Sequence, residues 1–162
     1  MKKATFIIVF VFQTINLLAQ TSCDDLKKEN EYLKKALSIT TPVKTVSGPN
    51  VDFNLIKCEG DSKQQKLTVV FTVLNHDANK YFFMDKADAI DVEANQYHTT
   101  STLIGSRSVS NTIYTETPVK ASIEFSKILP SVKMLKLVSI PYALGNQVNL
   151  AFEFRDIPVT WK

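Results

Sequence analysis

Glycine, cysteine and histidine are all scarce in this sequence, whose 162 residues include four glycines, two cysteines and two histidines. No glycine-rich loop of the kind that cradles phosphate groups is present, and no Gly-x-Ser-x-Gly motif marks a hydrolase nucleophile. His76 and His98 have no histidine or cysteine nearby at the spacing of a zinc site. We therefore expect a protein that is not an enzyme and that uses no metal ion or cofactor.

Calcium is the remaining metal to consider, because four acidic residues fall close together in the chain: Asp85, Asp88, Asp91 and Glu93. The segment lacks the glycine and the alternating ligands of an EF-hand loop, and apolar residues interrupt it. We interpret it as a solvated strand edge or loop.

A strong charge of either sign is also missing. The formal net charge is +3. Lys2 and Lys3 lie in a segment that we expect to be removed, and subtracting them from 19 basic residues leaves 17 against 16 acidic ones. A net charge of about +1 gives no electrostatic reason to expect nucleic acid or an anionic membrane as a partner.

Long hydrophobic runs are absent, because the apolar segment Ala4–Phe12 is too short to span ~30 Å of hydrocarbon. It follows a basic start and precedes Ala19, which is the layout of a secretory signal peptide. We predict a signal peptide over residues 1–20, cleaved after Ala19 or Gln20, and an extracytoplasmic location (periplasmic, surface or secreted). A retained membrane anchor is the weaker alternative.

Cys23 follows the expected cleavage site almost directly. Gln20 is a poor match to the residues that precede a lipid-modified cysteine, which argues against lipid attachment. We expect membrane association only if Cys23 is lipidated. Outside the cytoplasm disulfides are permitted, and Cys23 and Cys58 are the only candidates.

Residues 21–39 contain the one clearly helical pattern, over residues 24–38. Asp24 and Asp25 stand at its start, where the helix dipole favours negative charge. A heptad assignment places Glu29 at a g position and Lys34 at an e position, which could pair between helices. The a and d positions of that heptad are Cys23, Leu26, Asn30, Leu33 and Leu37.

This pattern predicts self-association of the helix, with an interchain Cys23 disulfide as one form of it. Two heptads are short for stable pairing. The alternative is an amphipathic helix that lies on its own β-domain or frays as a stalk.

Residues 40–50 contain prolines, a glycine and several hydroxyl side chains, which predicts a linker. From residue 51 to 162 the hydrophobic pattern has a period of two. Lys66–Asn75 is filled with β-branched and aromatic residues on both faces, which predicts a central strand. About seven short strands with no helical pattern between them indicate an all-β, antiparallel sandwich, with a long mobile loop over Leu103–Asn111.

Four segments, Leu67–Asn75, Asp91–Tyr97, Thr117–Phe125 and Val132–Val138, follow one another as strands and turns. Their order resembles a group of bacterial extracytoplasmic immunoglobulin-like domains of unknown function. The resemblance covers about Val51–Phe154, with Ala94 where the pattern of that group favours Gly. It implies an immunoglobulin-like sandwich behind a signal peptide and a linker, and it implies no catalytic or ligand-binding residues.

The aromatic run Tyr81, Phe82 and Phe83 predicts either a partner-binding patch or a plug of the sandwich core by at least one of the three rings. We expect a secreted, non-enzymatic binding or scaffolding module of the bacterial cell envelope. Its partner would be an unidentified protein or glycan, and its N-terminal helix could form a homo-oligomer. The alternative is a glycan-binding module or small hydrolase that uses the region Tyr81–Tyr97.

Overall fold

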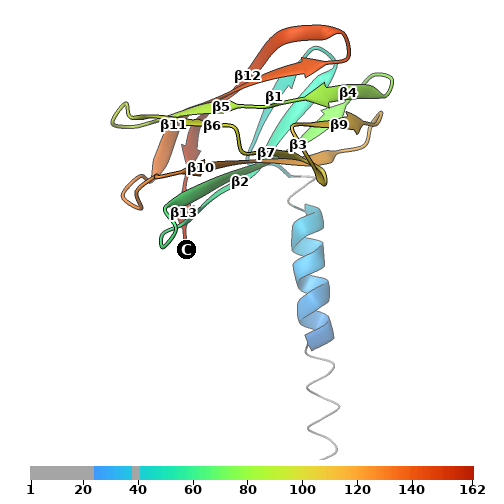
Figure 1. Ribbon diagram of the computed structural model, residues 1–162. Helices are drawn as coiled ribbons and strands as arrows, with labels where there is room; N and C mark the ends of the chain where they lie inside the picture. Colours follow the sequence, from blue (N-terminus) through green and yellow to red (C-terminus); the bar gives the residue numbers. More distant parts are fainter. Residues whose placement is uncertain (1–23, 38–40) are drawn as a thin grey trace, which may run out of the picture. The chain divides into compact units, whose positions relative to one another are not determined.

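The computed structural model describes residues 24–37 and 41–162, which belong to two compact units, residues 1–40 and residues 41–162 (Figure 1). The predicted signal peptide and Cys23 lie outside the described residues. Within the described ranges, no helix combines the length and the apolar character needed to cross a bilayer.

In the first unit, residues 24–37 form an α-helix, close to the predicted range. Its first turns carry two ion pairs at i,i+3 spacing, Lys27–Asp24 at 3.9 Å and Lys28–Asp25 at 3.8 Å. Such exposed pairs add only a few tenths of a kcal/mol each to a helix. Every residue of this helix is exposed.

The second unit is a sandwich of two mostly antiparallel sheets, as predicted (Figure 1). The described residues form thirteen strands, so the prediction of about seven was wrong. The seven-stranded sheet contains β1 (Lys44–Gly48), β2 (Val51–Asp61), β3 (Lys66–Asn75), β7 (Thr102–Ile104), β8 (Arg107–Ser108), β10 (Val119–Ser126) and β13 (Thr160–Trp161). The six-stranded sheet contains β4 (Lys80–Phe83), β5 (Ala87–Asp91), β6 (Gln96–Thr99), β9 (Ser110–Ile113), β11 (Met134–Leu144) and β12 (Gln147–Pro158).

Strand β3 is central in the seven-stranded sheet, which confirms the prediction for Lys66–Asn75. It pairs with β2 on one side and with β10 on the other. Leu67, Val69, Phe71 and Val73 face the core and are fully buried. Thr72 on the opposite face is also buried.

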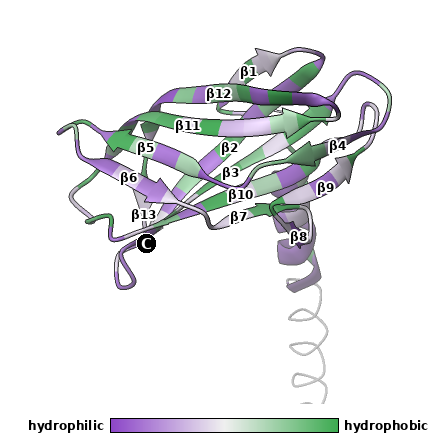
Figure 2. Ribbon diagram, turned by 45° about the horizontal axis from the view of Figure 1, so that its top comes forward, coloured by the Kyte–Doolittle hydropathy of each residue, from purple (hydrophilic) through white to green (hydrophobic). Residues whose placement is uncertain are grey.

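The core between the sheets is dominated by aromatic rings. Phe53 of β2 stacks on Phe152 of β12 with ring centroids 3.6 Å apart, and it meets Tyr142 of β11 edge-on at 5.1 Å. Coloured by hydropathy, the strands alternate between apolar and polar residues, as expected when one face of each sheet meets the core (Figure 2). The same cluster also includes Phe71, Phe82 and Phe154.

Strand β11 organises the six-stranded sheet. It pairs along its length with β12 on one side, while on the other side β5 and β4 follow one another along it. Pro141 lies between the segment of β11 that pairs with β5 and the segment that pairs with β4. A proline is tolerated there because no strand requires its missing N–H group.

Two predicted irregular segments are in fact partly strands. The predicted linker over residues 40–50 is wrong for Lys44–Gly48, which forms β1 and pairs with the start of β2. The predicted loop Leu103–Asn111 is wrong because most of it belongs to β7, β8 and β9. Gly105 at φ +62° makes the tight turn between β7 and β8.

Candidate functional site

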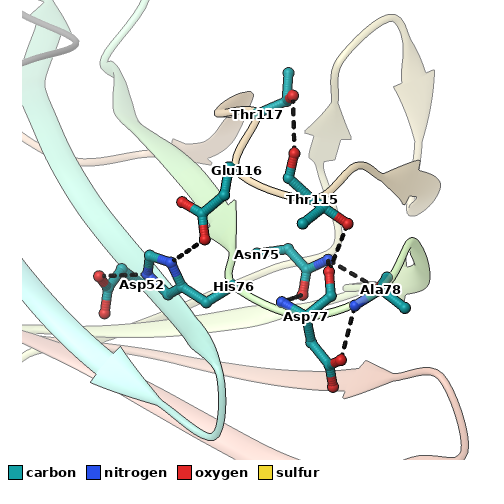
Figure 3. A network of polar contacts seen from close by, with 8 residues as sticks. All are labelled: Asp52, Asn75, His76, Asp77, Ala78, Thr115, Glu116 and Thr117. Atoms are coloured by element: carbon teal, nitrogen blue, oxygen red, sulfur yellow. Dashed lines mark hydrogen bonds and ion pairs between the residues drawn. The ribbon is translucent and has the colours of Figure 1, made fainter.

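A histidine clamp joins β2, the segment after β3 and the segment before β10 (Figure 3). His76, just after β3, is bonded through Nε2 to Asp52 Oδ2 and through Nδ1 to Glu116 Oε1, both at 2.9 Å. Hydrogen bonds to Asp52 and then to Glu116 are the main causes that raise the pKa of His76 above its usual value. Because both ring nitrogens face carboxylates, the clamp favours imidazolium and suits a structural tie better than a general base.

Next to this clamp, the buried Asn75 organises the loop between β3 and β4. Its Nδ2 donates to the carbonyls of Asp77 and Ala78 at 2.8 and 3.0 Å (Figure 3). The Thr115 hydroxyl donates to the same Asp77 carbonyl at 2.7 Å, which joins this loop to the one before β10. These bonds satisfy buried polar groups.

Asp91 is a buried carboxylate that holds the β5–β6 hairpin. Its Oδ1 accepts the backbone N–H groups of Glu93 and Asn95, both at 2.9 Å. Its Oδ2 accepts Asn95 Nδ2 at 2.9 Å and the Tyr97 hydroxyl at 2.8 Å. Burial opposes ionisation, but these four bonds outweigh it and lower the pKa of Asp91.

The same hairpin explains the role of Ala94, which adopts φ +64°. This left-handed conformation is the one in which glycine is unstrained.

Asp91 is one of the four acidic residues considered for calcium, and its carboxylate oxygens already accept hydrogen bonds from its own turn. Among the residues that the structure describes, no group of three or more His, Cys, Asp or Glu side chains is arranged to hold a metal ion.

Cys58 of β2 is a free, buried thiol in the core. Burial, and to a smaller extent Glu59, raises the pKa of Cys58 to about 12, so the thiolate form is strongly disfavoured. The environment is that of a structural core cysteine and not of a nucleophile.

The aromatic run on β4 divides between the two faces of the sheet. Phe82 is fully buried and contacts the core rings, so it is wrong to include it in a partner-binding patch. The alternative that at least one ring plugs the core is confirmed. Tyr81 and Phe83 point outward, with 55% and 36% of their surfaces exposed.

Phe83 borders a hollow on the outer face of the six-stranded sheet, which we call the strand-break hollow. It lies beside the short segment that connects β4 to β5. The hollow has a volume of about 300 Å³. Its apolar lining comes from Phe83, Pro141, Ala143 and Val148, and its polar lining from Asp85, Lys86 and Asn149.

The break between β4 and β5 is fixed by the buried residue Met84. Its N–H group donates to the carbonyl of Val109 at 2.7 Å, and its carbonyl accepts the Thr102 hydroxyl at 2.8 Å. The backbone at Met84 is therefore bonded away from β11, and beside Pro141 no strand continues the pairing. The hollow is a consequence of this arrangement.

A larger groove, of about 530 Å³, lies on the outer face of the seven-stranded sheet, over Val70. Lysines surround it, but Lys57 and Lys162 both pair with Glu59, at 2.7 and 3.1 Å. Asp61 accepts the N–H groups of Lys63 and Gln64. Of the six charged side chains that line this groove, three therefore bind one another, namely Lys57, Glu59 and Lys162.

The predicted self-association positions that the structure describes are Leu26, Asn30, Leu33 and Leu37. All four are exposed on the helix of residues 24–37. Leu26 and Leu33 expose 59% and 56% of their surfaces.

Sequence reasoning missed the half of the strand-break hollow that comes from β11 and β12. Pro141 inside an otherwise regular strand was the available signal, since a proline there marks a position without a pairing partner on one side. Neither a protein-family model nor a curated protein sequence matches the chain.

Proposed function

We propose that this chain is an exported, non-enzymatic binding or scaffolding module of the cell envelope that self-associates through its N-terminal helix. The observation that carries the proposal is the exposure of the helix side formed by Leu26 and Leu33. A large apolar side chain that remains exposed on a regular helix favours burial against a partner.

The charge pattern of the helix supports a second copy of the same helix as that partner. In a parallel pair, Glu29 at g lies near Lys34 at e of the neighbouring helix, while Asn30 at a can fix the register. A helix of this length is marginal alone, so pairing also supplies the stability that the isolated segment lacks.

The polar clusters of the sandwich support a role without catalysis. His76 binds two carboxylates, Asp91 accepts four hydrogen bonds from its own hairpin, and Cys58 is buried in the core. The side chains of His76 and Asp91 are thus occupied by bonds that hold loops and turns together, and the Cys58 thiol is kept from solvent by burial.

Export and an immunoglobulin-like relationship belong to the same proposal. Export is supported by the basic and apolar pattern of residues 1–20. The relationship is supported by the two facing antiparallel sheets and by the left-handed turn at Ala94, where the related domains favour glycine.

The test is the molecular mass in solution of residues 21–162, measured by light scattering under oxidising and reducing conditions. We expect a dimer or higher oligomer. The variant Leu33→Asp should shift it towards monomer by placing a charge at a d position. Tyr32→Asp is the matched control, because Tyr32 is exposed at a c position outside the seam.

A monomeric intact chain under oxidising conditions would refute self-association. Equal effects of the Leu33 and Tyr32 variants would refute the proposed seam. Loss of the oligomer only on reduction would assign the association to the Cys23 disulfide and not to helix packing.

A further inference from the structure

We propose that the strand-break hollow, together with the exposed ring of Tyr81, binds a neutral oligosaccharide. This site lies wholly within residues 41–162 and does not depend on self-association of the helix. It names a ligand class for the binding module through observations separate from those that concern the helix.

The hollow combines apolar residues with polar side chains that have no hydrogen-bond partner among the described residues. The side chains of Asp85, Lys86 and Asn149 are exposed and form no hydrogen bond or ion pair with the rest of the described chain. They offer a carboxylate acceptor, an ammonium donor and an amide that both donates and accepts. A ligand for this hollow must therefore present an apolar surface beside several hydroxyl-like groups.

The residues that line the hollow argue against other classes of ligand. A phosphate or sulfate would meet Asp85 next to Lys86, which cancels most of the attraction. A metal ion would require a cluster of ligands that the described residues lack. A purely apolar ligand would leave all three polar side chains without partners as it removed them from water. A sugar ring meets each requirement, since its C–H face is apolar and its edge carries hydroxyl groups.

A second ring extends the site along β4. Tyr81 and Phe83 lie on the same outer face because Phe82 between them points into the core. Positions two apart on a strand are separated by about 6.6 Å. The Tyr81 hydroxyl donates to Ser110 Oγ at 2.5 Å, which fixes the orientation of its ring. Two such platforms in sequence suit a chain of at least two sugar units and not a single sugar.

The position of the site gives it a rigid frame. Phe83 stands opposite Ala143 in the β4–β11 pair, and Met84 anchors the break with two short hydrogen bonds. The aromatic and apolar residues of the site and Asn149 lie on strands, while Asp85 and Lys86 lie in the short segment between β4 and β5. Sites built on strands hold their geometry more precisely than sites on loops. A rigid platform reduces the ordering cost of binding a flexible glycan.

Affinity electrophoresis of residues 21–162 tests this proposal, with soluble glucan, mannan and galactan as neutral probes and polygalacturonate as the acidic probe. We expect at least one neutral polymer to retard the protein and polygalacturonate to retard it less. Phe83→Ala should weaken the binding about tenfold, the loss typical of a central aromatic contact. Tyr81→Ala and Asn149→Ala should weaken it several-fold.

Tyr114→Ala is the matched control, because Tyr114 exposes 54% of its surface and does not line the hollow. Far-ultraviolet circular dichroism verifies that each variant is folded, and Tyr81→Ala, at an exposed position, keeps the test decisive if Phe83→Ala unfolds. Failure of all three neutral polymers to retard the wild-type protein overturns the proposal. Equal retardation of wild type, Tyr81→Ala and Asn149→Ala also overturns it, as does preferential binding of polygalacturonate.

Discussion

Replacement of Asp91 by alanine should destabilise the sandwich by about 2–4 kcal/mol at pH 7. The carboxylate accepts four hydrogen bonds, from Glu93, from Asn95 twice and from Tyr97. A net hydrogen bond contributes about 0.5–1.5 kcal/mol. The lower part of that range applies here because the donors on the exposed turn regain water, and four such bonds give the stated loss.

The loss should also depend on pH in a defined direction. The folded-state pKa of Asp91 lies below its ordinary value of 3.8, so the carboxylate contributes stability at and above that value. This contribution is lost as the pH falls through the lowered folded-state pKa. The difference between wild type and Asp91→Ala should therefore be complete at pH 7 and should shrink in acid below about pH 4.

Urea denaturation followed by circular dichroism measures both effects. Asp88→Ala on the same strand is the control, because Asp88 is more exposed and its side chain pairs only with His98, at 3.0 Å. An exposed pair of this kind contributes about 0–1 kcal/mol. If Asp91→Ala costs less than about 1 kcal/mol, or if its cost stays constant into strong acid, the four bonds do not stabilise the hairpin as we reason.

Other substitutions test the core, the turns and the histidine clamp. Phe53→Ala should cost about 3–5 kcal/mol in urea denaturation, because it leaves a cavity among stacked rings, and a cost below about 2 kcal/mol would contradict the described packing. Gly60→Ala should cost about 1–3 kcal/mol, because its Cβ would lie 2.2 Å from the ring of Trp161, and an unchanged melting temperature would argue against that contact. Ala94→Gly should raise the stability by about 1 kcal/mol by relieving a left-handed conformation, whereas a loss would show that the turn is unstrained. The His76 clamp, with its raised pKa, contributes stability that is complete below pH 6.5 and lost as the pH rises through the folded-state pKa, so the urea midpoint should fall from pH 6 to pH 8 more in wild type than in His76→Gln.

The strands that sequence reasoning predicted best are those whose pattern extends over many residues. Lys66–Asn75 alternates β-branched and aromatic residues without interruption, and it is β3. Val119–Phe125 alternates just as clearly and lies within β10. That β10 pairs with β3 could not be predicted, because periodicity identifies a strand and not its neighbour.

The misses have a common physical cause, which is that short strands are stabilised by their partners. Lys44–Gly48 stands between prolines, and its strand character comes from its pairing with β2. On β4, the alternation of Tyr81, Phe82 and Phe83 places one ring opposite the other two, but it does not tell which side is the core. The hollow beside Phe83 needs Pro141 from a distant strand and so appears only in the folded chain.

Trp161 provides a built-in optical probe, because it is the single tryptophan of the sequence. Its Nε1 donates to the Val132 carbonyl at 2.7 Å, and its strand β13 pairs with β2 through only two residues. Short terminal strands open at a lower free energy than the core. Tryptophan emission should therefore change at a lower urea concentration than circular dichroism does, and the gap between the two midpoints measures how tightly the end of the chain is held.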